Sequence, residues 1–280
     1  MRILVTNDDG IHAPGLEVLE NIARALSKDV WVVAPEVEQS GASHSLTLHM
    51  PVRVRKINAR RFAVSGTPTD CVLLALQEII PRRKHSLSLR ERVGVRALTP
   101  AGATPLPKGE GVQVDLILSG VNRGSNAADD VTYSGTVAAA MEGCILDVPS
   151  MALSLLCDDR EKIHWPTAQR HAPALIRKLA AAGWPKNSLI NINFPDCPPG
   201  KVKGVRVCPQ GKRQVSVALS ERIDPKGRPY FWIGGERENT PDRPGVDIDL
   251  LEKGYITVTP LCMDLTDHKT AEKIRKQLEK

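Results

Sequence analysis

Two adjacent carboxylates, Asp8 and Asp9, follow the short apolar run at residues 3–5, and Gly10 comes next. An apolar run that stops at acidic residues and glycine is typical of a buried parallel strand. Ligands of open α/β sheets bind just beyond the carboxyl ends of such strands. Because Mg²⁺ and Mn²⁺ prefer oxygen ligands, the pair predicts a metal site. The alternative is an ordinary turn, since Asp bonds nearby backbone N–H groups and glycine tolerates positive φ.

Two further polar residues, Ser40 and Asn122, each come shortly after an apolar run that predicts a strand. Taken alone, the Ser/Gly-rich segment around Ser40 is also explained as a simple connector. Together, two carboxylates, a hydroxyl and an amide oxygen form an all-oxygen set that suits one Mg²⁺ or Mn²⁺ ion per subunit. We therefore expect Asp8, Asp9, Ser40 and Asn122 to meet at one edge of one sheet.

A phosphate site is predicted where Ser134, Gly135 and Thr136 lead into the helical pattern at residues 137–144. The first N–H groups of a helix lack partners and lie at the positive end of its dipole, so they attract anions. The alternative is a plain N-cap at Ser134 or Thr136. The residues expected to bind phosphate or substrate are Asn7, Gly41, Ser43, Asn126, Ser134, Gly135 and Thr136.

The elements that must position these residues alternate strands with helices. A strand at 30–34 follows a helix at 16–26, and this βαβ unit implies a right-handed crossover and a parallel sheet. Thr69 or Asp70 is expected to cap the helix that follows them. Further strands are predicted at 46–56, 61–64, 115–119, 150–155 and 189–194, and helices at 71–80, 137–144 and 165–182. Residues 1–195 are thus predicted to form an α/β catalytic core.

Two parts of the chain depart from this pattern. Residues 82–114 mix basic, Gly and Pro residues without a period and predict a surface insertion. Residues 196–280 predict an antiparallel hairpin and helix extension. The final helix is expected to pack either on a partner subunit or as a cap on its own subunit. The predicted elements of the extension are strands at 202–207, 214–219, 230–233 and 255–259 and a helix at 266–280.

Composition narrows the class of protein. The 280 residues carry a formal net charge of +6, but the basic residues are scattered, which favours a solvated surface with an anionic substrate. Aromatic residues make up 4% of the chain, too few for stacking platforms along single-stranded nucleic acid. We expect no nucleic-acid duplex and no membrane as partners, because no apolar stretch approaches about 18 residues. With no signal-peptide pattern and six cysteines without metal-site spacing, a cytoplasmic location with buried thiols is expected.

Several of these motifs, taken in order, resemble the SurE family of metal-dependent 5′/3′-nucleotidases. The resemblance extends over nearly the whole chain, and the segment at 82–114 is the main departure, because the family usually crosses more directly from helix to strand. That departure leaves the predicted metal ligands untouched. The matching segments are residues 7–15, 34–35 with 39–41, 65–71, 119–126, 133–136 and 254–261.

The resemblance implies a Rossmann-like, three-layer αβα core and a C-terminal hairpin region exchanged between subunits of a homodimer or homotetramer. It implies a divalent metal held by Asp8, Asp9, Ser40 and Asn122. The implied substrates are nucleoside 5′-monophosphates, with 3′-monophosphates and, in some members, short polyphosphate. Asp8 and Asp9 are the expected catalytic residues, one of them accepting a proton from an attacking water.

Other mechanisms and functions stay open on the residues alone. A strand-end Asp can itself attack phosphorus, although an Asp that binds a metal is less free to do so. A transferase acting on nucleotides or sugar nucleotides uses similar acidic residues and a metal, but needs an acceptor. A non-catalytic, oligomeric nucleotide sensor is the third reading, and phosphate release in water alone separates it and the transferase from a phosphatase.

Overall fold

A computed structural model describes residues 1–80, 114–157, 162–184, 186–213, 219–233 and 241–279. Its main feature is a nine-stranded sheet in the order β3-β4-β2-β1-β5-β6-β7-β11-β8. The strands from β4 to β7 in this order are parallel, and β3 pairs antiparallel with β4 at one edge. These strands are β1 (Arg2–Thr6), β2 (Asp29–Pro35), β3 (Val54–Asn58), β4 (Arg61–Val64), β5 (Leu116–Arg123), β6 (Ser150–Leu155) and β7 (Ser188–Phe194).

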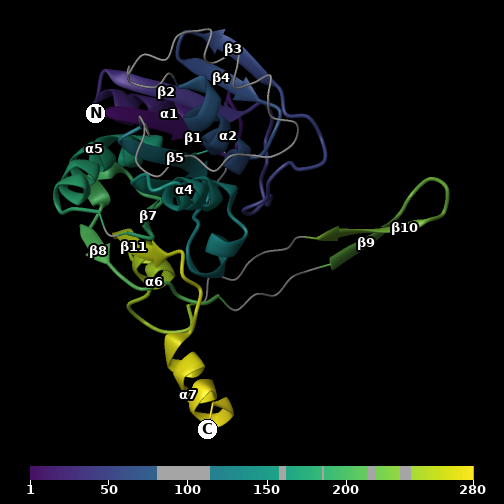
Figure 1. Cartoon of the computed structure of the whole chain (residues 1–280), viewed down its shortest axis with the longest axis vertical. Coiled ribbons are helices and arrows are strands. Elements are labelled where there is room, and N and C mark those ends of the chain that lie inside the picture. The colour runs from purple at the N-terminus through teal and green to yellow at the C-terminus, as the bar shows by residue number, and fades with distance from the viewer. Residues whose placement is uncertain (81–113, 158–161, 185, 214–218, 234–240, 280) are drawn as a thin grey trace.

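Helices cover both faces of the sheet, which confirms the predicted three-layer α/β core (Figure 1). Because successive residues of a strand point to opposite faces, Ile3 and Val5 of β1 pack into one core cluster and Leu4 into another. The first cluster lies under α1 (Pro14–Arg24) and α5 (Trp165–Ala181). The second lies under α2 (Pro68–Leu74) and α4 (Gly135–Ile145).

Some observed helix and strand boundaries differ from the predicted ones. The helix predicted at 71–80 begins earlier, because Thr67 is the N-cap and forms a capping box with Asp70. Thr69 and Asp70, the expected caps, therefore lie inside α2, which continues as a π-helical turn, η1 (Ala75–Ile79). The strand predicted at 46–56 is wrong over most of its length, since β3 begins at Val54.

The C-terminal part contributes to the main sheet, contrary to the expectation that its strands form an antiparallel appendage. β11 (Ile256–Cys262) pairs antiparallel with β7, and β8 (Val205–Val207) pairs parallel with β11. Their apolar residues Ile256 and Val258 belong to the core cluster under α1 and α5. The alternating pattern of these strands therefore marks the edge of the main sheet as well as a separate hairpin.

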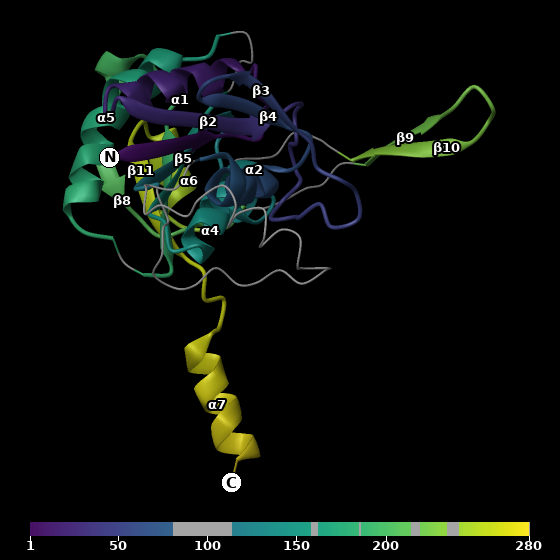
Figure 2. The ribbon, with the colours of Figure 1, turned by 45° about the horizontal axis from the view of Figure 1, so that its top comes forward.

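Two elements of the C-terminal part project from the body (Figure 2). One is the antiparallel hairpin of β9 (Leu219–Ile223) and β10 (Pro229–Ile233). The other is α7 (His268–Leu278). Short helices complete the fold: η2 (Ala128–Thr132), η3 (Pro199–Lys201) and α6 (Asp247–Glu252).

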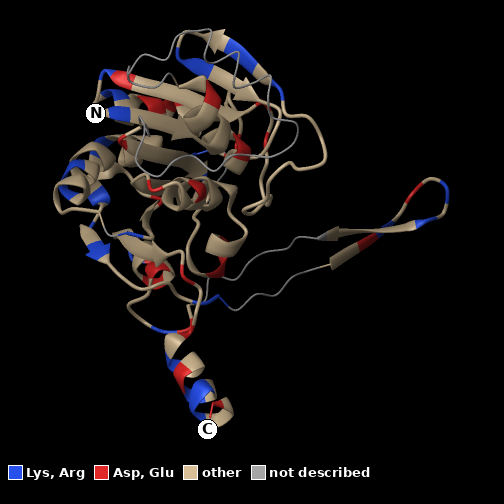
Figure 3. Cartoon of the chain, in the orientation of Figure 1, with Lys and Arg blue, Asp and Glu red and all other residues tan. Residues whose placement is uncertain are grey.

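Charged residues of both signs are interspersed over the described elements (Figure 3). No helix of the described part of the chain is long and apolar enough to cross a bilayer. Cys71, Cys144 and Cys208 are buried, as expected, and burial raises the pKa of their thiols. The predicted insertion at 82–114, apart from Val114, lies outside the described residues, as does most of the strand predicted at 214–219.

Candidate active site at the carboxyl end of β1

Three loops and the start of α4 meet at Asp8 and Asp9, which leave the end of β1. The backbone N–H of Gln39, after β2, donates to the carbonyl oxygen of Asp8 at 2.8 Å. The backbone N–H of Arg123, at the end of β5, donates to Asp9 Oδ2 at 3.4 Å. The hydroxyl of Thr136, in the first turn of α4, donates to Asp8 Oδ1. Segments more than a hundred residues apart are thus joined directly through the two carboxylates.

The turn after β1 is shaped by its own residues. Asn7 Nδ2 donates to the carbonyl oxygen of Gly10 at 3.0 Å, and Gly10 has φ +100°, a conformation that favours glycine. The strand has therefore ended before Asp9, so the two carboxylates need not point to opposite faces of the sheet. Asn7 Oδ1 is buried and accepts no hydrogen bond within the described part of the chain.

Electrostatics favour a cation at this turn. Burial raises the pKa of Asp8, which is 4% exposed. Burial, followed by the charge of Asp8, raises the pKa of Asp9 to about 6, although Arg123 opposes that shift. Two carboxylates that resist ionisation together are stabilised by a positive charge between them. The donor set at this turn therefore fits a divalent ion.

Ser40 and Asn122 are the sequence neighbours of Gln39 and Arg123, whose backbone N–H groups contact the two aspartates. Ser40 follows Gln39 directly and its hydroxyl donates to Glu38 Oε1 at 2.7 Å. Asn122 is half-buried, and its Nδ2 donates to the carbonyl oxygen of Gly124 at 2.9 Å, whereas a cation would bind its amide oxygen. Asn122 lies within β5, which runs to Arg123 and not only to residue 119 as predicted, with a shift in its register against β6.

The composition of the site restricts the kind of metal centre. Within the described residues, no group of three or more His, Cys, Asp or Glu side chains is placed to hold a metal ion. A cation at Asp8 and Asp9 would therefore need hydroxyl, amide or water oxygens to complete its shell. Such a shell is typical of hard ions.

The start of α4 packs directly on Asp8. Ser134 is the N-cap, and its hydroxyl accepts a hydrogen bond from the backbone N–H of Val137 at 3.1 Å, which confirms the capping role. A Cβ on Gly135 would lie 2.8 Å from the Cβ of Asp8 and 3.0 Å from its Oδ2. Glycine at this position therefore permits the close approach of the helix N-terminus to the carboxylate.

The loop that carries Ser40 is held against the segment before α4. The Ser43 hydroxyl donates to the carbonyl oxygen of Thr132 at 2.8 Å, and His44 Nε2 lies 3.0 Å from Glu142 Oε2 on α4. Thr47 donates from its hydroxyl to Asp70 Oδ2 at 2.6 Å. Gly41 has φ +76° and open space around it. These contacts hold the part of the segment from Ser43 to Thr47.

Asn126 takes part in a buried polar cluster behind this edge of the sheet. Its Nδ2 donates to Ser154 Oγ at 2.8 Å, and its backbone N–H donates to Asn193 Oδ1 at 2.8 Å. Asn191 and Asn193 both donate to its carbonyl oxygen. Asn126 thus contacts β6 and β7, and these hydrogen bonds hold the loop that leads to α4.

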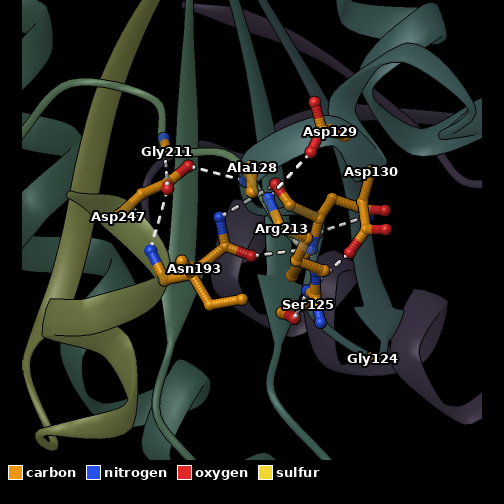
Figure 4. Close-up of polar contacts among 12 residues, drawn as sticks. Gly124, Ser125, Ala128, Asp129, Asp130, Asn193, Gly211, Arg213 and Asp247 are labelled. Carbon is orange, nitrogen blue, oxygen red and sulfur yellow. Dashed lines mark hydrogen bonds and ion pairs between the residues drawn. The ribbon is translucent and has the colours of Figure 1, made fainter. Parts of the chain in front are cut away.

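The same loop is tied to the base of the projecting hairpin (Figure 4). Arg213 donates to Asp130 Oδ2 at 2.6 Å and, through its backbone N–H, to Asp129 Oδ2 at 2.8 Å. Asp247 accepts from the backbone N–H groups of Ala128 and Gly211, at 2.9 and 2.8 Å. The position of the loop before α4 therefore depends on residues near the C-terminus.

A cleft of about 440 Å³ opens beside Asp9. Of the residues that line it, only Asp9 is among the predicted site residues, and those missed include Glu38, Arg123 and Trp165. Glu38 and Arg123 adjoin the predicted ligands, whereas Trp165 carries only the signal of an amphipathic helix. A second cleft, of about 400 Å³, lies at Asp196, Lys201 and neighbouring residues and contains none of the predicted site residues. The cleft beside Asp9 is lined by Asp9, Ala13, Pro14, Gly15, Glu38, Arg123, Ile163 and Trp165.

The chain is similar to known proteins over nearly its whole length. The family model "Survival protein SurE" matches residues 3–89 and 94–217, so its match is interrupted only inside the segment 82–114. The 5′-nucleotidase SurE of Parvibaculum lavamentivorans is 51% identical over 99% of this chain and 91% of its own length. That of Brucella canis is 52% identical over 96% of this chain and 95% of its own.

A solved structure is similar over its whole length. The crystal structure of the SurE protein from Aquifex aeolicus matches with a TM-score of 0.75 and 35% identity, covering 99% of each chain. The sequence match and the fold thus agree from the first strand to the last helix. This chain belongs to the SurE family.

Proposed function

We propose that this chain is a metal-dependent phosphomonoesterase that hydrolyses nucleoside 5′-monophosphates to nucleoside and phosphate. Relatives that share half of its sequence are named 5′-nucleotidase SurE, which supports a nucleotidase. The observation that carries the proposal is that three separate segments contact the adjacent residues Asp8 and Asp9, two of them through the carboxylates and one through the backbone carbonyl oxygen of Asp8. Nucleoside 3′-monophosphates and short polyphosphate are proposed as secondary substrates.

The proposed cofactor is one Mg²⁺ or Mn²⁺ ion per subunit, held by Asp8, Asp9, Ser40 and Asn122. The all-oxygen donor set and the raised pKa of Asp9, about 6, support a cation at this place. When bound, the ion supplies a Lewis acid for the phosphoryl group and lowers the pKa of bound water.

The protein's own residues would orient the phosphate and move one proton. The start of α4 at Gly135 and Thr136 lies at the positive end of the helix and suits a phosphate oxygen, whereas the backbone N–H of the N-cap Ser134 donates to the carbonyl oxygen of Asp130 at 3.0 Å. Asp9 borders the open cleft, so we assign it the role of accepting the proton from the attacking water. The water oxygen bonds to phosphorus as the phosphorus–oxygen bond to the nucleoside breaks, and the leaving oxygen takes up a proton.

A covalent aspartyl-phosphate is a weaker explanation for this site. Asp8 is buried and its Oδ1 already accepts a hydrogen bond from Thr136, which restricts its approach to phosphorus. Direct attack by water avoids that restriction. We propose in addition that the enzyme acts in the cytoplasm and that the segment 196–280 joins two or four subunits.

The substitution Asp8→Asn tests the proposal. It keeps the size of the side chain and removes its charge, so metal-dependent phosphate release from AMP should fall by at least about a thousandfold, as for loss of a central charge-stabilising group. Asp147→Asn, at the other end of α4, is the matched control, because φ is +58° there and Asn tolerates that conformation. Thermal unfolding checks that both variants fold.

Three outcomes of this assay are informative. EDTA should abolish activity, and Mn²⁺ or Mg²⁺ should restore it. Full activity of Asp8→Asn would overturn the assignment of the site. Phosphate release that requires an added acceptor would indicate a transferase, and nucleotide binding without any release would indicate a sensor.

A further inference from the structure

The cleft beside Asp9 is lined by two chemically different groups of residues. One group is charged and consists of Asp9, Glu38 and Arg123. The other, called here the apolar wall, consists of Ile163 and Trp165 together with Ala13 and Pro14 at the start of α1. Clefts that bind small molecules are commonly apolar with a few polar groups at fixed positions, and 440 Å³ lies within their usual range. The lining therefore suits a ligand with one polar end, which the proposed cation would help to bind where that end is a phosphate, and one apolar end.

The apolar wall is built by contacts that fix Trp165. Trp165 is the first residue of α5, and its backbone N–H donates to the carbonyl oxygen of Ile163 at 2.9 Å. The indole packs against α1, where a Cβ on Gly15 would lie 3.1 Å from its Cη2 atom. The same Cβ would lie 2.0 Å from the carbonyl oxygen of Val121, so α1 itself is pressed against β5. The half-buried indole therefore has a fixed place in the cleft wall.

We infer that Trp165 and Ile163 form the subsite for the nucleobase, a deepening of the proposed function on which it rests. With the phosphate at Asp8 and Asp9, the nucleoside extends along the cleft towards the apolar wall. A nucleobase is flat and uncharged, and it stacks on aromatic side chains, whereas a free sugar phosphate gains little from such a wall. Three of the four residues of this wall, Ala13, Pro14 and Ile163, carry no polar side-chain group to read a base edge.

The inferred subsite predicts which nucleotides the enzyme prefers. Recognition by stacking depends on the area of the ring, so purine nucleotides should be preferred over pyrimidine nucleotides. Adenine and guanine should be distinguished little, because discrimination between them requires hydrogen bonds to their edges.

The test compares AMP with ribose 5-phosphate, which lacks the base, in the metal-loaded enzyme. Trp165→Ala should lower kcat/KM for AMP by about tenfold, within the range measured for base–aromatic stacking, mainly through a higher KM. Its kcat/KM for ribose 5-phosphate should stay within about twofold of wild type. Trp165→Phe should recover most of the AMP activity, and the ratio of AMP to UMP activity should fall in Trp165→Ala.

Trp184→Ala is the matched control, because Trp184 follows the other end of α5 and is likewise half-buried against the same core cluster. This variant should not lower kcat/KM for one substrate more than for the other. Equal loss of AMP and ribose 5-phosphate hydrolysis in Trp165→Ala, or no loss of either, would overturn the nucleobase subsite. If wild type hydrolyses neither compound, the proposed function fails. Calorimetric binding of AMP to wild type and Trp165→Ala then still tests the subsite, and equal affinities overturn it.

Discussion

At the scale of single residues, the contact between Thr136 and Asp8 joins the start of α4 to the predicted metal site. The hydroxyl is buried and donates to Asp8 Oδ1, so it holds the carboxylate in one orientation. Thr136→Val removes this donor with little change in shape. Loss of a group that orients a ligand typically weakens metal affinity by about 10- to 100-fold. We expect the Mn²⁺ concentration for half-maximal activity to rise by that factor.

Thr167→Val is the control for this prediction. Thr167 is also buried, but its hydroxyl donates to the carbonyl oxygen of Cys197, which follows β7, and not to a predicted metal ligand. Both variants should lose about 1–3 kcal/mol of unfolding free energy, because each leaves an acceptor unpaired. If Thr136→Val needs the same Mn²⁺ concentration for half-maximal activity as wild type, the hydroxyl stabilises the fold but does not affect metal affinity.

Residue types and spacing single out Asp8 and Asp9, where separate segments meet, but not Glu38, Arg123 or Trp165 in the cleft beside them. Asp8, Asp9 and Asn122 are recognisable because polar oxygens at strand ends have few structural reasons to be there. Trp165 gives no such signal, since an aromatic residue that begins an amphipathic helix is normally read as core. Its role in the cleft depends on its tertiary contact with Gly15, which no local pattern encodes.

At the scale of elements, two glycines show that α4 serves the site at one end and the sheet at the other. A Cβ on Gly135 would lie 2.8 Å from the Cβ of Asp8. A Cβ on Gly143 would lie 2.2 Å from Ser150 Oγ and 2.5 Å from Ile117 Cδ1. Gly135→Ala should therefore displace Asp8 and lower kcat by at least about tenfold, because small misplacements of catalytic groups cost large factors.

Its effect on stability should be small, since alanine is favoured over glycine in a helix by about 1 kcal/mol. Gly143→Ala should do the reverse, with a loss of about 1–3 kcal/mol through overpacking and near-normal kcat per folded molecule. Chemical denaturation and steady-state kinetics on both variants separate the two effects. Equal loss of activity in both would mean that α4 moves as one body.

Sequence patterns predict elements well where one interaction dominates and poorly where tertiary contacts decide. The strand at 150–155 is observed with the predicted bounds, because its apolar run is buried in the centre of the sheet. The predicted cap of α2 was wrong because the Thr67 hydroxyl, and not that of Thr69, accepts from the N–H of Asp70. β8 and β11 alternate like hairpin strands, yet β7 leaves a free edge that β11 fills.

At the scale of the whole molecule, the β9–β10 hairpin projects from the body (Figure 2), and several of its apolar side chains are exposed. Phe231 is 56% exposed and Trp232 65% exposed, and as neighbours on one strand they point to opposite faces. A two-stranded hairpin is marginally stable alone, so these faces need cover. We propose that a second copy of the chain supplies it, in line with the dimer or tetramer that the family resemblance implies.

The double substitution Phe231→Ser/Trp232→Ser tests that proposal, because it removes the apolar surface while sparing β7, β11 and the site. Wild type should have the mass of a dimer or tetramer by light scattering, and the variant should shift towards lower mass at the same concentration. Lys226→Ala, in the exposed turn of the same hairpin, should leave the mass unchanged. Since Arg213 ties the hairpin base to the loop before α4, dissociation should also lower nucleotidase activity per subunit. A monomeric wild type, or an unchanged mass of the double variant, would show that the hairpin is not the contact between subunits.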